Sequence, residues 1–195
     1  MSKIFIVMGK SATGKDTIYK KLLESDEIKL KTAVMYTTRP IRAGEQDGVE
    51  YFFVEEAALQ LLKEQNKIIE HRSYQTVQGE WHYFTVNDGQ IDLEHSSYLM
   101  IGTLETFEQI REYFGKDKVW PIYIEVEDGL RLMRAINREK EQSLPQYSEM
   151  CRRFLADEED FSEENLARIG INKRYQNNNM DDCINQIVSD VKKLL

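Results

Sequence analysis

A glycine-rich segment that directly follows an apolar run constrains the fold of this chain more than any other feature. Residues 4–8 read Ile-Phe-Ile-Val-Met, as in a buried strand, and residues 9–17 read Gly-Lys-Ser-Ala-Thr-Gly-Lys-Asp-Thr. Glycines let backbone N–H groups curl around an anion, and a following helix N-terminus adds a favourable partial positive charge. The order of strand, glycine loop and helix therefore predicts the first unit of a parallel α/β sheet, with a loop that binds nucleotide phosphates.

The end of this loop decides the expected chemistry. Lys15 is expected to reach the outer phosphates of a nucleotide and to act in catalysis. Asp16 stands where a Ser or Thr usually follows the lysine, and Thr17 comes one residue later, so the pattern leaves the magnesium chemistry open. The residues of the loop expected to bind ATP are Gly9, Lys10, Ser11, Ala12, Thr13, Gly14, Lys15, Asp16 and Thr17.

Composition and charge exclude several classes of protein. No apolar run among the 195 residues approaches the ~18 residues of a membrane-spanning helix. The net charge of −8 argues against general nucleic-acid binding, so attraction for a nucleotide must come from a few concentrated cations. The chain opens with strand residues instead of a signal peptide, and Cys151 and Cys183 match no metal-ligand spacing. We therefore expect a cytoplasmic protein with reduced thiols.

Apolar periodicity and turn residues predict an α/β chain that is interrupted by a mostly antiparallel segment. The expected strands are residues 3–8, 30–38, 49–54, 68–72, 81–86, 98–103 and 119–126, with a turn at 78–80. The expected helices are residues 17–24, 55–65, 104–114, about 128–160 with a break near 143–145, and 180–194.

A turn-rich segment carries the second group of candidate residues. Residues 37–52 read Thr-Thr-Arg-Pro-Ile-Arg-Ala-Gly-Glu-Gln-Asp-Gly-Val-Glu-Tyr-Phe. Arg39 and Arg42 can grip one phosphate with charge-assisted hydrogen bonds, and Tyr51 can add a hydroxyl donor. On these residues alone, a solvated loop without a ligand stays open as the alternative.

This segment resembles the GMP-binding signature of guanylate kinases, in which Thr-Thr-Arg, an Arg three residues on, Gly-Glu, Asp-Gly and Tyr-Phe recur. The resemblance covers essentially the whole chain in order. It implies a P-loop three-layer α/β/α fold with a central parallel sheet, a small, mostly antiparallel GMP-binding insertion and a helical lid. The single domain, residues 1–195, would divide into a core (1–32, 91–130 and 160–195), an insertion (33–90) and a lid (131–159).

The resemblance also implies roles for residues of the insertion. Arg39, Arg42, Tyr51 and Tyr83 would hold the GMP phosphate. Glu70 would accept hydrogen bonds from the guanine N1–H and 2-amino groups, which adenine does not present there. Thr85 would contact guanine from the place of a family Ser, whereas Met35 stands where a second such Ser is usual. An exposed strand residue is the alternative interpretation of Glu70.

In the lid, the resemblance implies that Arg134, Arg138 and Arg153 meet the charge that develops on the transferring phosphoryl group. A solvated charged helix is the alternative, and Arg152 competes with Arg153 for its place. Asn177 lies in an Asn-Asp run that resembles the adenine contact of the family, although a turn and helix cap explain these residues equally well.

The chain departs from the family at a strand that usually carries acidic residues. Here Met100 and Gly102 occupy both acidic places. We hypothesise that Asp16 supplies the missing carboxylate, indirectly through magnesium-bound water, while Thr17 keeps its hydroxyl role toward the metal.

The resemblance implies an ATP-dependent kinase that converts GMP and ATP into GDP and ADP with Mg²⁺ as cofactor. The expected partners are these nucleotides, without nucleic acid or membrane, and protein partners are unknown. Two alternatives remain: a kinase acting on a phosphorylated sugar such as ribose 1,5-bisphosphate, and a non-catalytic interaction module of guanylate-kinase shape.

Overall fold

Four parallel strands form the centre of the molecule in the computed structural model, which describes residues 2–42, 44–76 and 79–195. The strands are β1 (Ile4–Met8), β6 (Tyr98–Ile101), β7 (Val119–Glu125) and β8 (Arg174–Gln176), in the order β6-β1-β7-β8. Ile4 of β1 lies opposite Tyr98 on one side and Val119 on the other. Because β1 is flanked by strands on both sides, the loop that follows it lies in the middle of the carboxyl edge of the sheet.

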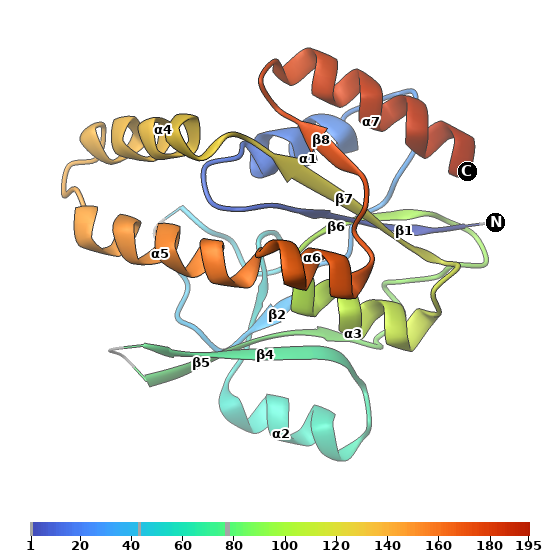
Figure 1. The fold of residues 1–195 in the computed structure, drawn as a ribbon. Coiled ribbons are helices and arrows are strands. Elements are labelled where there is room, and N and C mark those ends of the chain that lie inside the picture. Colours follow the sequence, from blue (N-terminus) through green and yellow to red (C-terminus); the bar gives the residue numbers. More distant parts are fainter. Residues whose placement is uncertain (1, 43, 77–78) are drawn as a thin grey trace.

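Helices cover both faces of this sheet (Figure 1). Phe5 and Val7 point to one face and pack with α1 (Lys15–Leu23) and α7 (Met180–Leu194). Ile4, Ile6 and Met8 point to the other face and pack with α3 (Leu104–Phe114) and α6 (Glu163–Ile169). A strand buried on both faces needs apolar residues at successive positions, which explains the uninterrupted apolar run. The predicted three-layer α/β/α fold is confirmed.

A second sheet, also of four strands, lies in the lower part of Figure 1. It consists of β2 (Tyr36–Thr37), β3 (Phe52–Phe53), β4 (Ile68–Thr76) and β5 (Gly79–Val86), in the order β3-β2-β5-β4. β2 pairs parallel with β3, while β2–β5 and β4–β5 are antiparallel. Its helix, α2 (Glu56–Glu64), contributes Leu59 to a small apolar cluster with Phe84 and Val86. The insertion is mostly antiparallel, as predicted.

Several predicted boundaries are wrong, and each has a physical reason. Of the predicted strand 30–38, only Tyr36 and Thr37 form β2, while Ala33 and Met35 pack into the core. The predicted turn at 78–80 fails because Gly79 and Glu80 belong to β5; Gln78 lies outside the described residues. The helix α6 and the strand β8 were not predicted, because segments of seven and three residues are too short to show a clear apolar period.

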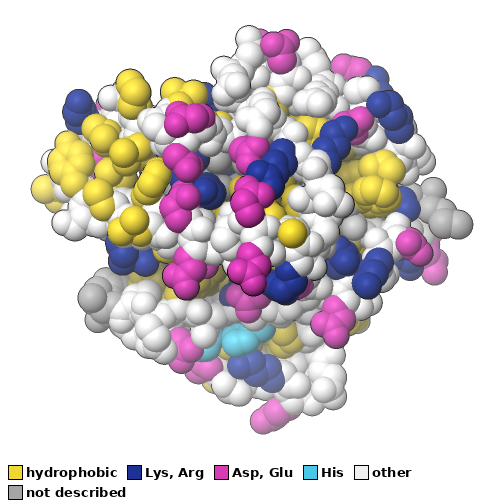
Figure 2. Space-filling view, viewed as in Figure 1, with side chains coloured by type: hydrophobic (Ala, Val, Ile, Leu, Met, Phe, Trp, Pro, Cys, Tyr) yellow, Lys and Arg dark blue, Asp and Glu magenta, His cyan; other side chains and the backbone are white. Residues whose placement is uncertain are grey.

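Two helices, α4 (Asp128–Lys140) and α5 (Tyr147–Asp160), project from the sheet and form the left side of Figure 1. The predicted break between them is present, and buried Glu139 stabilises it by accepting a hydrogen bond from the backbone N–H of Gln146. Figure 2 shows hydrophobic side chains gathered where the two helices meet and acidic side chains over α5. Among the described residues, no helix is long and apolar enough to cross a membrane.

Candidate active site

The glycine-rich loop is tightly enclosed by neighbouring chain. A Cβ on Gly9 would come within 2.5 Å of the Ile124 carbonyl oxygen, and one on Gly14 within 2.7 Å of the Asn177 amide nitrogen. Gly14 also has φ +83°, in the left-handed region, where it precedes the first turn of α1. Ala12 adopts φ +63° without being glycine. The loop therefore has a specific, sterically restricted path that turns directly into the N-terminus of a helix.

Asn177 holds this loop in place through hydrogen bonds. Its side-chain Nδ2 donates to the Thr13 carbonyl at 2.7 Å, and its backbone N–H donates to the Glu125 carbonyl at 2.9 Å. The side chain is buried, with 1% of the residue exposed. The adenine contact predicted for Asn177 stays a prediction, but the structure gives the residue a positioning role that sequence reasoning missed. The helix cap in the same run belongs to Asn179, whose side chain accepts from two N–H groups at the start of α7.

Lys15, Asp16 and Thr17 occupy the first turn of α1. The Lys15 side chain is 20% exposed and its Nζ lies 3.8 Å from an Asp16 carboxylate oxygen, while Asp16 and Thr17 face solvent. Met100 is buried in the core, and a Cβ on Gly102 would meet Thr106 at 2.8 Å. Met100 thus lies in the core and Thr106 crowds half-buried Gly102, while Asp16 is an exposed carboxylate beside the loop lysine.

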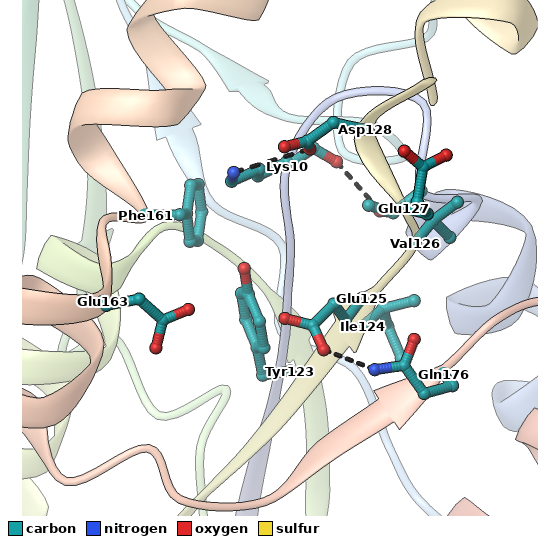
Figure 3. Close-up of a pocket in the computed structure, with 11 residues that line it drawn as sticks. Lys10, Tyr123, Ile124, Glu125, Val126, Glu127, Asp128, Phe161, Glu163 and Gln176 are labelled. Carbon is teal, nitrogen blue, oxygen red and sulfur yellow. Dashed lines mark hydrogen bonds and ion pairs between the residues drawn. The ribbon is translucent and has the colours of Figure 1, made fainter. Parts of the chain in front are cut away.

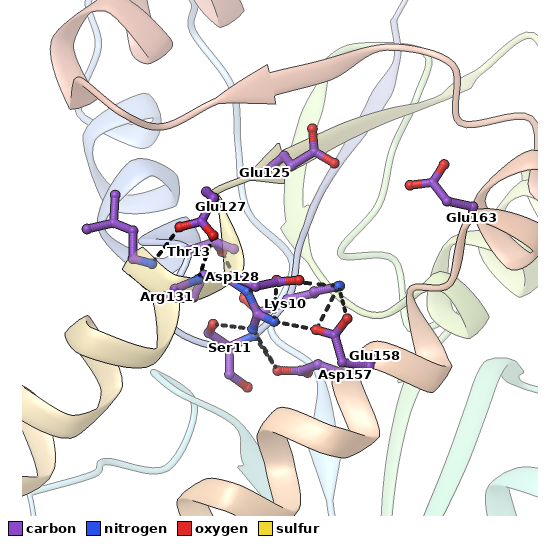
Figure 4. Close-up of polar contacts among 12 residues, drawn as sticks. Lys10, Ser11, Thr13, Glu125, Glu127, Asp128, Arg131, Asp157, Glu158 and Glu163 are labelled. Carbon is purple, nitrogen blue, oxygen red and sulfur yellow. Dashed lines mark hydrogen bonds and ion pairs between the residues drawn. The ribbon is translucent and has the colours of Figure 1, made fainter.

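A buried arginine links α4 and α5 to the glycine-rich loop (Figure 4). Arg131 of α4 is completely buried, and its Cζ lies 4.4 Å from the centre of the Phe154 ring. Its guanidinium donates to Asp128 at 2.8 Å, to Glu158 of α5 at 2.6 Å and to the Ser11 carbonyl at 3.1 Å. One side chain thereby joins both lid helices and the loop.

Helix α5 also presents carboxylates to the loop. An Asp157 oxygen accepts the Ser11 backbone N–H at 2.7 Å, and both Glu158 oxygens accept from Lys10 Nζ at 2.8 Å. Burial raises the pKa of Asp128, but hydrogen bonds from Arg131 and the charge of Lys10 outweigh it and hold that pKa below its ordinary value. The predicted ATP residues Lys10 and Ser11 are therefore engaged by the lid in this structure.

The predicted lid arginines differ in their surroundings. Arg134 donates to the Asn177 carbonyl at 3.1 Å, and Arg153 reaches the Ser11 hydroxyl at 3.5 Å. Arg152, the competing candidate, instead forms a surface pair with Glu149 at 2.7 Å. Arg138 is exposed on α4. The structure thus brings Arg134 and Arg153 to the loop region and favours Arg153 over Arg152.

A second group of polar residues lies on one face of the β4–β5 ribbon. Strand alternation places Glu70, Arg72 and Tyr74 on this face. Thr85 and Tyr83 lie opposite Glu70 and Arg72 on β5. The other face carries Phe84 and packs on α2. The two predicted guanine contacts and one predicted phosphate ligand therefore share one surface.

Arg39 stands beside this surface between aromatic rings. Its Cζ lies 5.1 Å from the centre of the Tyr51 ring, which lies 5.7 Å from the Tyr83 ring. Arg39 also forms a two-pronged pair with Glu45, with N–O distances of 2.6 and 2.7 Å. Hydrogen bonds from Arg39 lower the pKa of Glu45 to about 2. An incoming phosphate would share Arg39 with an ionised carboxylate, whereas the predicted ligand Arg42 is exposed.

Glu70 is buried instead of exposed, which removes the alternative of a solvated strand residue. Its carboxylate accepts from Arg72 at 3.1 and 3.3 Å and from the Thr85 hydroxyl at 3.3 Å. Burial raises the pKa of the Glu70 carboxyl above its ordinary value, and the charge of Arg72 opposes that rise. Sequence reasoning missed Arg72, although its spacing of two from Glu70 in a predicted strand was a sufficient signal.

A cleft of about 390 Å³ lies next to the loop but is not suited to phosphates (Figure 3). Glu125, Glu127, Asp128 and Glu163 line it, with Lys10 as its only lining cation among the described residues. Such a surface repels anions, whereas the first turn of α1, with its helix N-terminus and Lys15, attracts them.

A comparison with known protein families shows which family this chain resembles. A family model described as guanylate kinase matches residues 1–193. The chain belongs to the guanylate kinase family. Its fold is similar to a crystal structure of guanylate kinase from Anaplasma phagocytophilum, with a TM-score of 0.63 and 20% identity over 98% of this chain and 85% of that one.

Two curated guanylate kinases match shorter stretches. The protein of Schizosaccharomyces pombe is 43% identical over 68 residues, which make up 35% of this chain and 34% of that protein. The protein of Coxiella burnetii is 32% identical over 87 residues, 45% of this chain and 40% of that protein. The matches thus span between 30 and 40% of the length of the curated relatives. Membership in the guanylate kinase family is therefore clear, while the activity has to be argued from the site.

Proposed function

We propose that this protein is an ATP-dependent nucleoside monophosphate kinase that transfers the γ-phosphoryl group of ATP to GMP, giving ADP and GDP. One observation carries the proposal: a single chain contains both a glycine-rich loop with accessible Lys15 and a separate polar surface. That surface has a cation, Arg39, at one end and a buried carboxylate, Glu70, at the other. The loop suits the polyphosphate of a donor. Arg39 and Glu70 suit the phosphate and the base of an acceptor.

The proposed reaction needs little covalent work from the protein. An oxygen of the GMP phosphate attacks the γ-phosphorus while the bond to the β-phosphate oxygen breaks and its electrons leave with ADP. Lys15, Arg134 and Arg153 neutralise the negative charge of the transferring group, and Arg39 and Tyr51 orient the attacking phosphate. Arg138 joins them when the lid moves over bound nucleotide.

Magnesium fits the residues beside Lys15. Mg²⁺ prefers oxygen ligands and usually retains several waters, and Thr17 and Asp16 offer exposed oxygens in the first turn of α1. We propose that Thr17 holds the metal directly and Asp16 through water. When bound, the metal supplies charge neutralisation at the β- and γ-phosphates.

An acceptor survey tests the proposed function. ADP release from ATP and Mg²⁺ is measured with GMP, dGMP, AMP, UMP or ribose 1,5-bisphosphate in turn. We expect selective turnover of the guanine nucleotides with kcat on the order of 1–100 s⁻¹, as for other kinases. Turnover of the sugar bisphosphate alone would instead identify a sugar-phosphate kinase. No turnover of any acceptor would indicate a non-catalytic module of the same fold.

Replacement of Asp16 tests its proposed role toward the metal. Asp16→Asn is expected to lower kcat by about 10- to 100-fold and to raise the Mg²⁺ concentration for half-maximal rate, as for residues that orient a metal through its outer shell. The matched control is Asp26→Asn, an exposed aspartate just after α1, which should change neither quantity. A wild-type rate with unchanged magnesium dependence in Asp16→Asn would refute the role.

We further propose that residues 33–90 act as the acceptor-binding unit and residues 131–159 as a lid on a core of residues 1–32, 91–130 and 160–195. The two sheets and the projecting α4–α5 pair support this division. The free thiols of Cys151 and Cys183 support a reducing, cytoplasmic location. ATP and GMP are the proposed partners.

A further inference from the structure

Arg72 lies in the middle of the surface assigned to the acceptor base. Its Nε and Nη2 atoms contact the two oxygens of Glu70, and Nη2 also lies 3.9 Å from the sulfur of Met35. Only 8% of the residue is exposed. A buried arginine that forms two hydrogen bonds to the carboxylate expected to bind the base changes what that carboxylate can recognise.

The acceptor capacity of Glu70 is nearly filled. An ionised carboxylate offers about four lone-pair sites. Two N–H groups of Arg72 and the hydroxyl of Thr85 take three of them in this structure. Guanine brings two donors, N1–H and the 2-amino group, so Glu70 can serve one of them well but not both while Arg72 stays in place.

Arg72 has donors to spare. A guanidinium carries five N–H donors in one plane. Nε and Nη2 donate to Glu70 and Arg72 also hydrogen-bonds the Tyr74 side chain, which still leaves donors for a ligand. The pair therefore presents a donor next to an acceptor. A 6-oxopurine presents the complement, a carbonyl oxygen next to N1–H, whereas adenine presents an amino group next to a bare ring nitrogen. This match favours 6-oxopurines over adenine without using the 2-amino group.

We propose that Arg72 is a specificity-determining residue whose guanidinium, together with Glu70, reads the 6-oxo and N1–H groups of a 6-oxopurine nucleoside monophosphate. The inference rests on the proposed function and adds the substrate class: both GMP and IMP are acceptors. Discrimination between them is weak because the 2-amino group of guanine gains little from a carboxylate already occupied by Arg72.

Calorimetric titration of GMP, IMP and AMP onto the full chain, with kcat/KM measured in parallel, tests this proposal. In the wild type we expect GMP and IMP to differ by less than about 10-fold and AMP to bind far more weakly. Arg72→Met frees both Glu70 oxygens for N1–H and the 2-amino group, so the GMP preference over IMP should rise by about 10-fold or more. Arg72→Lys retains the charge but not the planar fork and should shift the ratio in the same direction.

The preference for GMP over IMP, expressed as a ratio of kcat/KM values, distinguishes an effect on recognition from an effect on folding. Arg72→Lys keeps a positive charge beside buried Glu70 without the two-pronged pairing, so it decides the matter if Arg72→Met does not fold. The control Arg168→Met, at an exposed arginine paired with Glu108, should leave the ratio unchanged. Two results would overturn the proposal while leaving the kinase function intact. One is an equal loss of kcat/KM for GMP and IMP in the Arg72 variants, and the other is a wild type that rejects IMP by more than about 10³-fold. A wild type that binds no nucleoside monophosphate would overturn the proposed function, and this inference with it.

Discussion

Lys15→Met should lower kcat by about 10³-fold, the loss expected when a preorganised cation that meets transition-state charge is removed. Lys15 starts α1 directly after the loop, and among the described residues its ion pair is a long one, 3.8 Å, with exposed Asp16. Its charge is thus available to a ligand. Methionine keeps the length of the side chain, so the loop and helix should fold as before. ADP release with saturating ATP and GMP measures the effect.

Lys20→Met provides the matched control for this experiment. Lys20 is exposed in the last turn of the same helix, so the same substitution there removes an equal charge from α1 without touching the loop. Its kcat should stay within about two-fold of wild type, since exposed charges contribute little. If Lys15→Met retained turnover within about 10-fold of wild type, Lys15 would not act on the transferring phosphoryl group.

Arg131→Met should lower the free energy of unfolding by on the order of 3 kcal/mol, because breaking a buried ion pair leaves carboxylates without their partner. Arg131 forms ion pairs with Asp128, Asp157 and Glu158, with N–O distances from 2.6 to 3.5 Å. Without it, Lys10 is the cation that remains paired with these carboxylates among the described residues, so like-charge repulsion should loosen α4 and α5 from the loop. Urea unfolding followed by circular dichroism measures the loss.

The control for this prediction lies in the same lid. Arg152 pairs with Glu149 at 2.7 Å, but its side chain is 65% exposed. Arg152→Met should therefore change the free energy of unfolding by less than about 0.5 kcal/mol. A loss below about 1 kcal/mol in Arg131→Met would mean that the desolvation of this arginine cancels its ion pairs, and the proposed tie between lid and loop would be energetically unimportant.

Long and strongly patterned elements could be predicted from sequence with their bounds, whereas the shortest strands were predicted as longer segments or not at all. The helix at 104–114 was predicted with its observed bounds because its apolar residues recur at helical spacing and Gly115 ends it. The strands β2 and β3 contain two residues each, so their existence depends on partners in β5 and on each other. No local pattern of the chain encodes such pairing.

In the candidate site, too, local features could be predicted from sequence and long-range contacts could not. The loop was predictable because its residues are consecutive and their conformation follows from glycine and the helix start. Asn177 and Thr13 are 164 residues apart, and Asp157 and Ser11 are 146 apart, so their contacts arise only when the sheet brings the loop, the lid and β8 together.

The sequence by itself determined the family, the glycine-rich loop after a buried strand and the types of residue available for binding, because these depend on order and spacing along the chain. Only the tertiary structure decided which of those side chains are free to bind. In the folded chain, Lys15 and Asp16 remain accessible, Arg39 pairs with Glu45, and Arg72 pairs with Glu70. The physical reason is that a charge acts on a ligand according to its burial and its partners, and both are set by contacts made on folding.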